Sequence, residues 1–179
     1  MNSEYEGQYQ GLIENLKWQP DNNLTRNNIK EPLNKLVTSY GSLTKALTEL
    51  RNDFSVNVLS QRVELPFYHE QKLIKKPLGR QAVIREVELQ IMGESIVFAR
   101  SILPLSLILK NQSGLADLGK KPLGHLLFKK GQIKVSKRQF CETNFQGKKC
   151  QARRTPYEYM GSTILVSEFF LPKIEILLK

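Results

Sequence analysis

The sequence contains few of the residues from which metal sites and nucleophilic active sites are built. Only two cysteines and two histidines occur among its 179 residues. A four-ligand zinc site needs such residues at close spacing, which Cys141, Cys150, His69 and His125 do not provide. No serine stands in a Gly-x-Ser-x-Gly setting, and two scattered histidines do not suit a Ser-His-Asp triad. We therefore expect neither a bound metal nor an activated nucleophile.

Long apolar runs and glycine-rich phosphate loops are also missing. The longest apolar run, Ile102–Leu109, is interrupted by a proline and a serine and is about half as long as the ~20 residues of a membrane helix. The first ten residues are acidic and polar, unlike a secretory signal peptide. No dinucleotide fingerprint predicts a nucleotide cofactor. We expect a soluble protein, without membrane insertion, in a reducing compartment where both cysteines are thiols; a disulfide between paired strands stays open.

Positive charge is abundant, and the net charge of +10 raises the possibility of a nucleic-acid partner. The basic residues, however, form dispersed pairs rather than one stripe, and no RNP motif, zinc-finger spacing or helix-turn-helix accompanies them. We therefore expect no nucleic-acid partner and interpret the charge as favouring solubility and attraction of a small anion. The pairs are Lys75-Lys76, Lys120-Lys121, Lys129-Lys130, Lys148-Lys149 and Arg153-Arg154.

Length and ordinary composition predict a single domain over residues 1–179, with an irregular lead-in over about residues 1–30. Helical patterns follow: Ser42 can cap a helix that begins near Leu43, and Pro122 suits the first position of another that carries Leu123. That second segment could also act as a lid. Strand patterns cover residues 54–65, 80–104 with a turn at 92–94, 133–137, 140–142 and 162–172.

Three charged residues interrupt the apolar faces of these predicted strands. Arg85 is two residues from both Val83 and Val87, so in a strand it lies on their apolar face. Arg100 likewise lies on the face of its apolar neighbours in the next strand, and Glu168 stands in a strand that is apolar on both faces. An unpaired buried charge costs several kcal/mol, so such side chains need partners or a ligand. If the three converge, the interior carries about one excess positive charge and favours a carboxylate, which arginine binds bidentately.

Two alternatives remain for these residues. Arg85 or Arg100 could form a purely structural ion pair with Glu168, although one glutamate does not neutralise two arginines. A β-bulge could also shift the parity by one residue and turn the arginines toward solvent.

Five sequence blocks, taken together and in this order, resemble chorismate lyases, including their plastid and cyanobacterial branch. They are YGSLTKAL, IREVELQIMGESIVFARSILP, LGKKPLGHLLF, ARR and ILVSEFFLP, which extend from Tyr40 to Pro172. The resemblance implies an α+β fold: a single domain with an antiparallel sheet of about six strands, helices packed on it, and an internal ligand cavity covered by flaps. It also implies a carbon-oxygen lyase that converts chorismate into 4-hydroxybenzoate and pyruvate without a cofactor.

The resemblance assigns roles to five residues. Arg85 corresponds to the arginine that binds the ring carboxylate and enolpyruvyl region, and Glu168 to the glutamate at the hydroxyl end of the product. Leu43 and Leu123 correspond to positions whose backbone amides hold the carboxylate under the flaps. Arg100 corresponds to a second arginine of the substrate passage or pocket. Chorismate and its aromatic product are then the expected partners.

An alternative of another class stays open, because the same fold is known as an effector-binding domain of transcription regulators. A non-catalytic module that senses aromatic acids would have the same pocket, although no DNA-binding module is visible in this chain. For the enzyme, we expect a monomer in the cytoplasm or the plastid stroma that supplies a quinone-ring precursor.

Overall fold

The computed structural model describes residues 7–14, 16–75, 77–109, 114–116, 118–129 and 133–178. Its strands are β1 (Gln19–Pro20), β2 (Ser55–Glu64), β3 (Ala82–Ile91), β4 (Glu94–Pro104), β5 (Lys134–Val135), β6 (Gln139–Phe145), β7 (Lys148–Tyr159) and β8 (Ser162–Phe170). Its helices are α1 (Gln10–Ile13), α2 (Asn23–Asn27), α3 (Leu33–Thr38), α4 (Leu43–Leu50), α5 (Tyr68–Gln71), α6 (Leu105–Ile108), α7 (Leu123–Lys129) and α8 (Ile174–Leu177).

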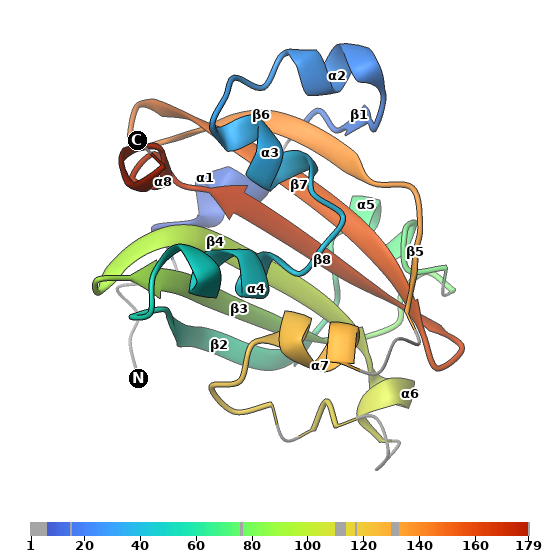
Figure 1. The fold of residues 1–179 in the computed structure, drawn as a ribbon. Helices are drawn as coiled ribbons and strands as arrows, with labels where there is room; N and C mark the ends of the chain where they lie inside the picture. Colours follow the sequence, from blue (N-terminus) through green and yellow to red (C-terminus); the bar gives the residue numbers. More distant parts are fainter. Residues whose placement is uncertain are drawn as a thin grey trace.

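All strands join one antiparallel sheet in the order β1-β6-β7-β8-β4-β3-β2, and β5 pairs with β7 (Figure 1). Helices α3, α4 and α7 cover one face, here called the front face, whereas α1 and α5 lie behind the sheet (Figure 1). The predicted α+β class is confirmed. The expected number of about six strands matches the six longer ones, and β1 and β5 add two residues each.

The β3–β4 hairpin turns where the sequence pattern predicts. Ile91 pairs with Glu94, and the two residues between them, Met92 and Gly93, have φ angles of 54° and 73°. A two-residue turn with both φ angles positive matches the right-handed twist of the paired strands. Counting outward from this turn would pair Arg85 with Arg100, but the register shifts by one residue between Leu89 and Gln90. Arg85 consequently lies opposite Ser101, and Glu86 opposite Arg100.

Both faces of the sheet are buried, so the protein has two apolar layers. On the front face, α3 and α4 pack their leucines against Val87, Leu89 and Ala99. On the back face, Leu12 of α1 packs in a cluster with Phe98 and Phe169. Adjacent residues of β4 and β8 consequently enter different cores, which explains why both strands are apolar at nearly every position.

The longest strand, β7, is absent from the sequence-based prediction. Residues 148–159 contain two arginines and a proline, which break the apolar alternation that identifies strands. In the structure this segment pairs with β6 on one side and β8 on the other, and Arg153 and Arg154 are both buried. Tertiary contacts therefore stabilise a strand that the local sequence does not predict.

The predicted start of α4 is confirmed: the helix begins at Leu43, and the Ser42 hydroxyl accepts a hydrogen bond from the Lys45 amide at 3.3 Å. Helix α7 begins at Leu123, one residue after the predicted first position at Pro122. Residues 7–30, part of the expected lead-in, contain α1, β1 and α2, whereas residues 1–6 lie outside the described ranges. In the part of the chain that the structure describes, no helix combines the length and apolarity needed to cross a membrane.

Both cysteines are free thiols buried in the back-face core, and this burial makes stability sensitive to alkaline pH. Burial, reinforced by the neighbouring Cys141, raises the pKa of the Cys150 thiol to about 12. In the unfolded chain this thiol ionises near its ordinary pKa of about 8.5. Below that pH the thiol is protonated in both states, so it does not change the free energy of unfolding. Above it, we expect a loss of about 1.4 kcal/mol per pH unit, which continues until the folded thiol also ionises.

Urea unfolding of the wild type and of Cys150→Ala between pH 8 and about 10.5 measures this effect. Other groups titrate over the same range in both proteins, so the informative quantity is the difference between their free energies of unfolding. As the pH rises, the wild type should lose more stability than the variant. Parallel curves would show that Cys150 is not protected from ionisation in the folded protein.

Candidate active site

A pocket lies on the front face, between the sheet and the first turns of α4 and α7. Residues of β3, β4 and β8 form its floor, and residues of α4 and α7 line it from the other side. Figure 1 shows these two helices in front of the sheet. Most of the lining is apolar, with one arginine and one glutamate as its charged members. The lining includes Val87, Ala99, Tyr157 and Val166 from the sheet, Leu43, Thr44, Leu123, Gly124 and Leu127 from the helices, and the polar residues Arg85, Ser101 and Glu168.

Arg85 enters this pocket from β3 and is 2% exposed. Its Nη1 donates a hydrogen bond to Gln61 Oε1 at 2.7 Å, and its Nη2 donates to the carbonyl oxygens of Gly119 and Lys121 at 2.8 and 3.4 Å. All three acceptors are neutral, and no carboxylate of the described residues pairs with the guanidinium. Burial accordingly lowers the pKa of Arg85 below its ordinary value.

Glu168 enters the same pocket from β8 and has an arginine partner of its own. The Nε of Arg153, directly opposite on β7, donates to Glu168 Oε2 at 2.5 Å. Arg153 is 1% exposed; burial alone would lower its pKa, but the charge of Glu168 and the hydrogen bond to it raise the pKa above its ordinary value. The two opposite charges compensate each other within the protein.

The charge of Arg85 therefore remains uncompensated. Because Arg153 neutralises Glu168, the pocket has an excess of about one positive charge, as the sequence predicts, although from a different set of residues. Neutral carbonyl and amide oxygens satisfy hydrogen bonds of Arg85 without cancelling its charge. A carboxylate in the pocket would both accept the planar guanidinium donors and compensate the charge.

Arg100 does not belong to this pocket, and the prediction that it converges with Arg85 is wrong. Its guanidinium lies on the back face, where Nε donates to Glu70 Oε1 at 2.9 Å and Nη1 donates to Glu86 Oε1 at 2.7 Å. Without the register shift between Leu89 and Gln90, Arg100 would lie opposite Arg85 on the same face of the sheet. The shift places it opposite Glu86 instead, and since both faces of β4 are buried, Arg100 stays buried on the other face.

Leu43 and Leu123 are the first residues of α4 and α7, and both line the pocket. The first amides of a helix have no acceptor within the helix, so they are available to an anion. The two helices approach closely at Gly124, where a Cβ atom would lie 3.1 Å from Thr44 Oγ1 and 3.3 Å from Ser42 Oγ. A glycine at this position thus permits both helix starts to meet above the pocket.

Sequence reasoning did not assign Arg153 as the partner of Glu168, yet a signal was present. The Met160-Gly161 turn between β7 and β8 repeats the Met92-Gly93 turn, with φ angles of 47° and 75°. Counting outward from a two-residue turn places Arg153 opposite Glu168. Gln61 and the Gly119 carbonyl, by contrast, carry no sequence signal of their contact with Arg85.

The described residues contain no group of three or more His, Cys, Asp or Glu side chains placed to hold a metal ion. The chemical means available in the pocket are one uncompensated guanidinium, one carboxylate oriented by an arginine, helix amides and an apolar wall. Such a set is suited to binding and orienting a small aromatic anion.

Comparison with known proteins agrees with this description. The sequence model of the family described as Chorismate lyase matches residues 12–176. A protein of Methylococcus capsulatus described as a probable chorismate pyruvate-lyase is 35% identical over 151 residues, which cover 77% of this chain and 93% of the relative. A protein of Aromatoleum aromaticum with the same description is 33% identical over 156 residues, covering 77% and 83%.

A solved structure shares the fold at much lower sequence identity. A GntR-family transcriptional regulator of Enterococcus faecalis superimposes with a TM-score of 0.51 and 13% identity, over 66% of this chain and 94% of the regulator. At this identity the likeness concerns the fold alone.

Proposed function

This chain belongs to the chorismate lyase family, and we propose that it converts chorismate into 4-hydroxybenzoate and pyruvate. The observation that carries the proposal is the buried, uncompensated Arg85 in a pocket whose walls are mainly apolar. Chorismate and 4-hydroxybenzoate each combine a ring with a carboxylate. The apolar walls can pack against the ring, and the carboxylate can compensate the charge of Arg85.

We propose an orientation for the ligand from the placement of the pocket residues. The ring carboxylate lies on Arg85, within reach of the first amides of α4 and α7 at Leu43 and Leu123. The opposite end of the ring, which carries the hydroxyl group, then faces Glu168. In this orientation the apolar side chains of Val87 and Leu127, which line the pocket, would pack against the ring. Arg100 has no part in this arrangement, because Glu70 and Glu86 bind its guanidinium on the back face.

The reaction makes modest chemical demands on the protein. The bond between the ring and the ether oxygen of the enolpyruvyl group breaks, the ring loses a proton and becomes aromatic, and the enolpyruvyl methylene gains a proton to give pyruvate. Aromatisation supplies the driving force, so no covalent nucleophile is required. The protein's task is to hold the dianion in one geometry and to stabilise the negative charge that develops on the leaving oxygen.

Incubation of the purified protein with chorismate tests the proposal. We expect 4-hydroxybenzoate and pyruvate to appear in equal amounts, without any added metal or cofactor, and to be absent when the protein is omitted. Binding of 4-hydroxybenzoate without any pyruvate release would instead favour a sensing module. Failure to bind either compound would reject the proposal.

Three finer points also belong to the proposal. The product supplies the ring of a quinone, the protein acts as a monomer, and the chain resembles the plastid and cyanobacterial branch of the family and acts in the plastid stroma or the cytoplasm. Their support is the set of sequence blocks from Tyr40 to Pro172. The relatives from Methylococcus and Aromatoleum are bacterial.

A further inference from the structure

We infer that Arg153 is a positioning residue, which fixes the carboxylate of Glu168 so that one of its oxygens recognises the hydroxyl group of the aromatic ligand. This inference rests on the proposed function, since it assigns a specificity determinant to the same pocket. It concerns the end of the pocket remote from Arg85, where a ligand is distinguished from analogues that have the carboxylate but lack the hydroxyl group.

The contacts of Glu168 divide its two oxygens between the protein and the pocket. Oε2 accepts the hydrogen bond from Arg153 Nε at 2.5 Å, across the β7–β8 pair. Oε1 accepts no hydrogen bond from the described residues, and Glu168 lines the pocket. One oxygen is thus held by the sheet while the other remains available to a donor. An ionised carboxylate only accepts hydrogen bonds, and a ring hydroxyl group is a suitable donor.

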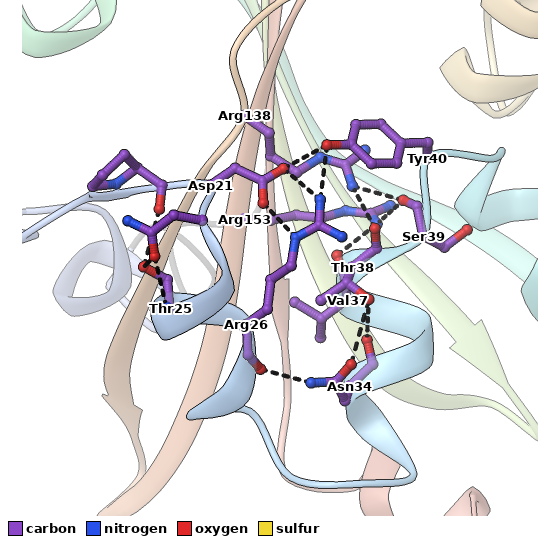
Figure 2. A network of polar contacts seen from close by, with 12 residues as sticks. Asp21, Thr25, Arg26, Asn34, Val37, Thr38, Ser39, Tyr40, Arg138 and Arg153 are labelled. Atoms are coloured by element: carbon purple, nitrogen blue, oxygen red, sulfur yellow. Dashed lines mark hydrogen bonds and ion pairs between the residues drawn. The ribbon is translucent and has the colours of Figure 1, made fainter.

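Arg153 can fix this carboxylate because its own guanidinium is held in place from two directions. Its Nη1 donates to the carbonyl oxygens of Leu36, Val37 and Ser39, at 3.1, 3.0 and 2.9 Å, where α3 ends (Figure 2). Its guanidinium also lies over the Phe170 ring, 5.5 Å from the ring centre. The last carbonyls of a helix lack partners within the helix and attract a positive charge. The fork geometry then directs Nε toward Glu168.

A second arginine shares the helix end and provides a matched control. Arg138 donates from Nη1 to the Thr38 and Ser39 carbonyl oxygens at 3.1 and 2.7 Å, and from Nε to the Thr155 hydroxyl group (Figure 2). Like Arg153 it is 1% exposed, but it makes no hydrogen bond to Glu168. Arg153 and Arg138 therefore have the same burial and similar carbonyl partners, and only Arg153 is in direct contact with the pocket glutamate.

The test compares the affinities for 4-hydroxybenzoate and benzoate, measured by calorimetric titration. Wild-type protein should bind 4-hydroxybenzoate about tenfold or more tightly than benzoate, the effect of a hydrogen bond to a charged group. Arg153→Gln should weaken both acids, because the Glu168 carboxylate is no longer neutralised, and it should also lose most of the preference, so that the ratio of the two affinities approaches one. Arg138→Gln should lower the melting temperature but retain the preference.

A purely structural role of Arg153 predicts a different result, in which Arg153→Gln weakens both ligands equally and leaves their ratio unchanged. If the wild type prefers 4-hydroxybenzoate over benzoate and Arg153→Gln keeps the same ratio of affinities, the inference is overturned and the proposed function stays intact. A wild type that binds neither ligand would count against the proposed function itself.

Arg153→Gln leaves Glu168 buried without its partner, so this variant could fail to fold. In that case Glu168→Gln is compared with the double variant Glu168→Gln/Arg153→Gln. Neither of these proteins has an unpaired carboxylate at position 168. If Arg153 acts only through Glu168, the two should have the same ratio of affinities, within about twofold. A further loss of preference in the double variant would contradict the inference.

Discussion

Arg85→Met is expected to abolish pyruvate release from chorismate while leaving the protein folded. The substitution retains the apolar stem of the side chain and removes the one pocket charge without a carboxylate partner. Truncating one member of a buried charge pair with the ligand costs about 2–5 kcal/mol, or on the order of 30- to 5,000-fold in affinity. Turnover should fall at least as far, because the same contact orients the substrate for the reaction.

The stability of Arg85→Met should change by no more than about 1–2 kcal/mol. The variant loses hydrogen bonds to Gln61, Gly119 and Lys121, but it no longer buries a charge whose desolvation is unfavourable. Urea unfolding and a coupled pyruvate assay give the two measurements. Wild-type turnover in a folded Arg85→Met protein would reject the role of Arg85, and with it the proposed orientation of the ligand.

Arg100→Met, the same substitution on the neighbouring strand, should have the opposite effect. Arg100 pairs with Glu70 and Glu86 on the back face, and the side chains of Arg100 and Glu70 are 6% and 2% exposed. Burial alone would lower the pKa of Arg100, but the hydrogen bonds and charges of the two glutamates raise it. Removal of the arginine leaves Glu70 buried without its partner, so the free energy of unfolding should fall by about 3–5 kcal/mol.

Two further measurements separate this effect from a role in binding. At a temperature where Arg100→Met is still folded, its affinity for 4-hydroxybenzoate should match that of the wild type, because the front-face pocket is unchanged. The double variant Arg100→Met/Glu70→Met should recover part of the lost stability, since no buried carboxylate remains at position 70. A stable Arg100→Met protein that no longer binds the ligand would mean that Arg100 acts in the substrate passage after all.

The sequence predicts the position of the charge anomalies better than it predicts their partners. Arg85 and Glu168 interrupt apolar strands, and both line the pocket. The alternation of β3 and β4, their turn and the capped start of α4 are local patterns, and all were predictable. Local patterns suffice where one strand and its turn determine the geometry.

Features that depend on distant parts of the chain were not predictable in the same way. Arg100 faces away from Arg85 because the register of β3 and β4 shifts by one residue between Leu89 and Gln90, and its partner Glu70 approaches from α5, a different segment. Strand β7 has no apolar pattern because its arginines serve the two opposite faces, Arg153 toward α3 and Arg154 toward His69. Only the assembled sheet shows which charge each of them meets.

The role of charge in ligand recognition is tested most directly by calorimetric titration of wild-type protein with 4-hydroxybenzoate and with 4-hydroxybenzyl alcohol. The two ligands have the same ring and hydroxyl group, and they differ in whether a carboxylate can reach Arg85. We expect the acid to bind at least about 30-fold more tightly than the neutral alcohol. Equal affinities would contradict the claim that an uncompensated arginine in this pocket selects a carboxylated ring.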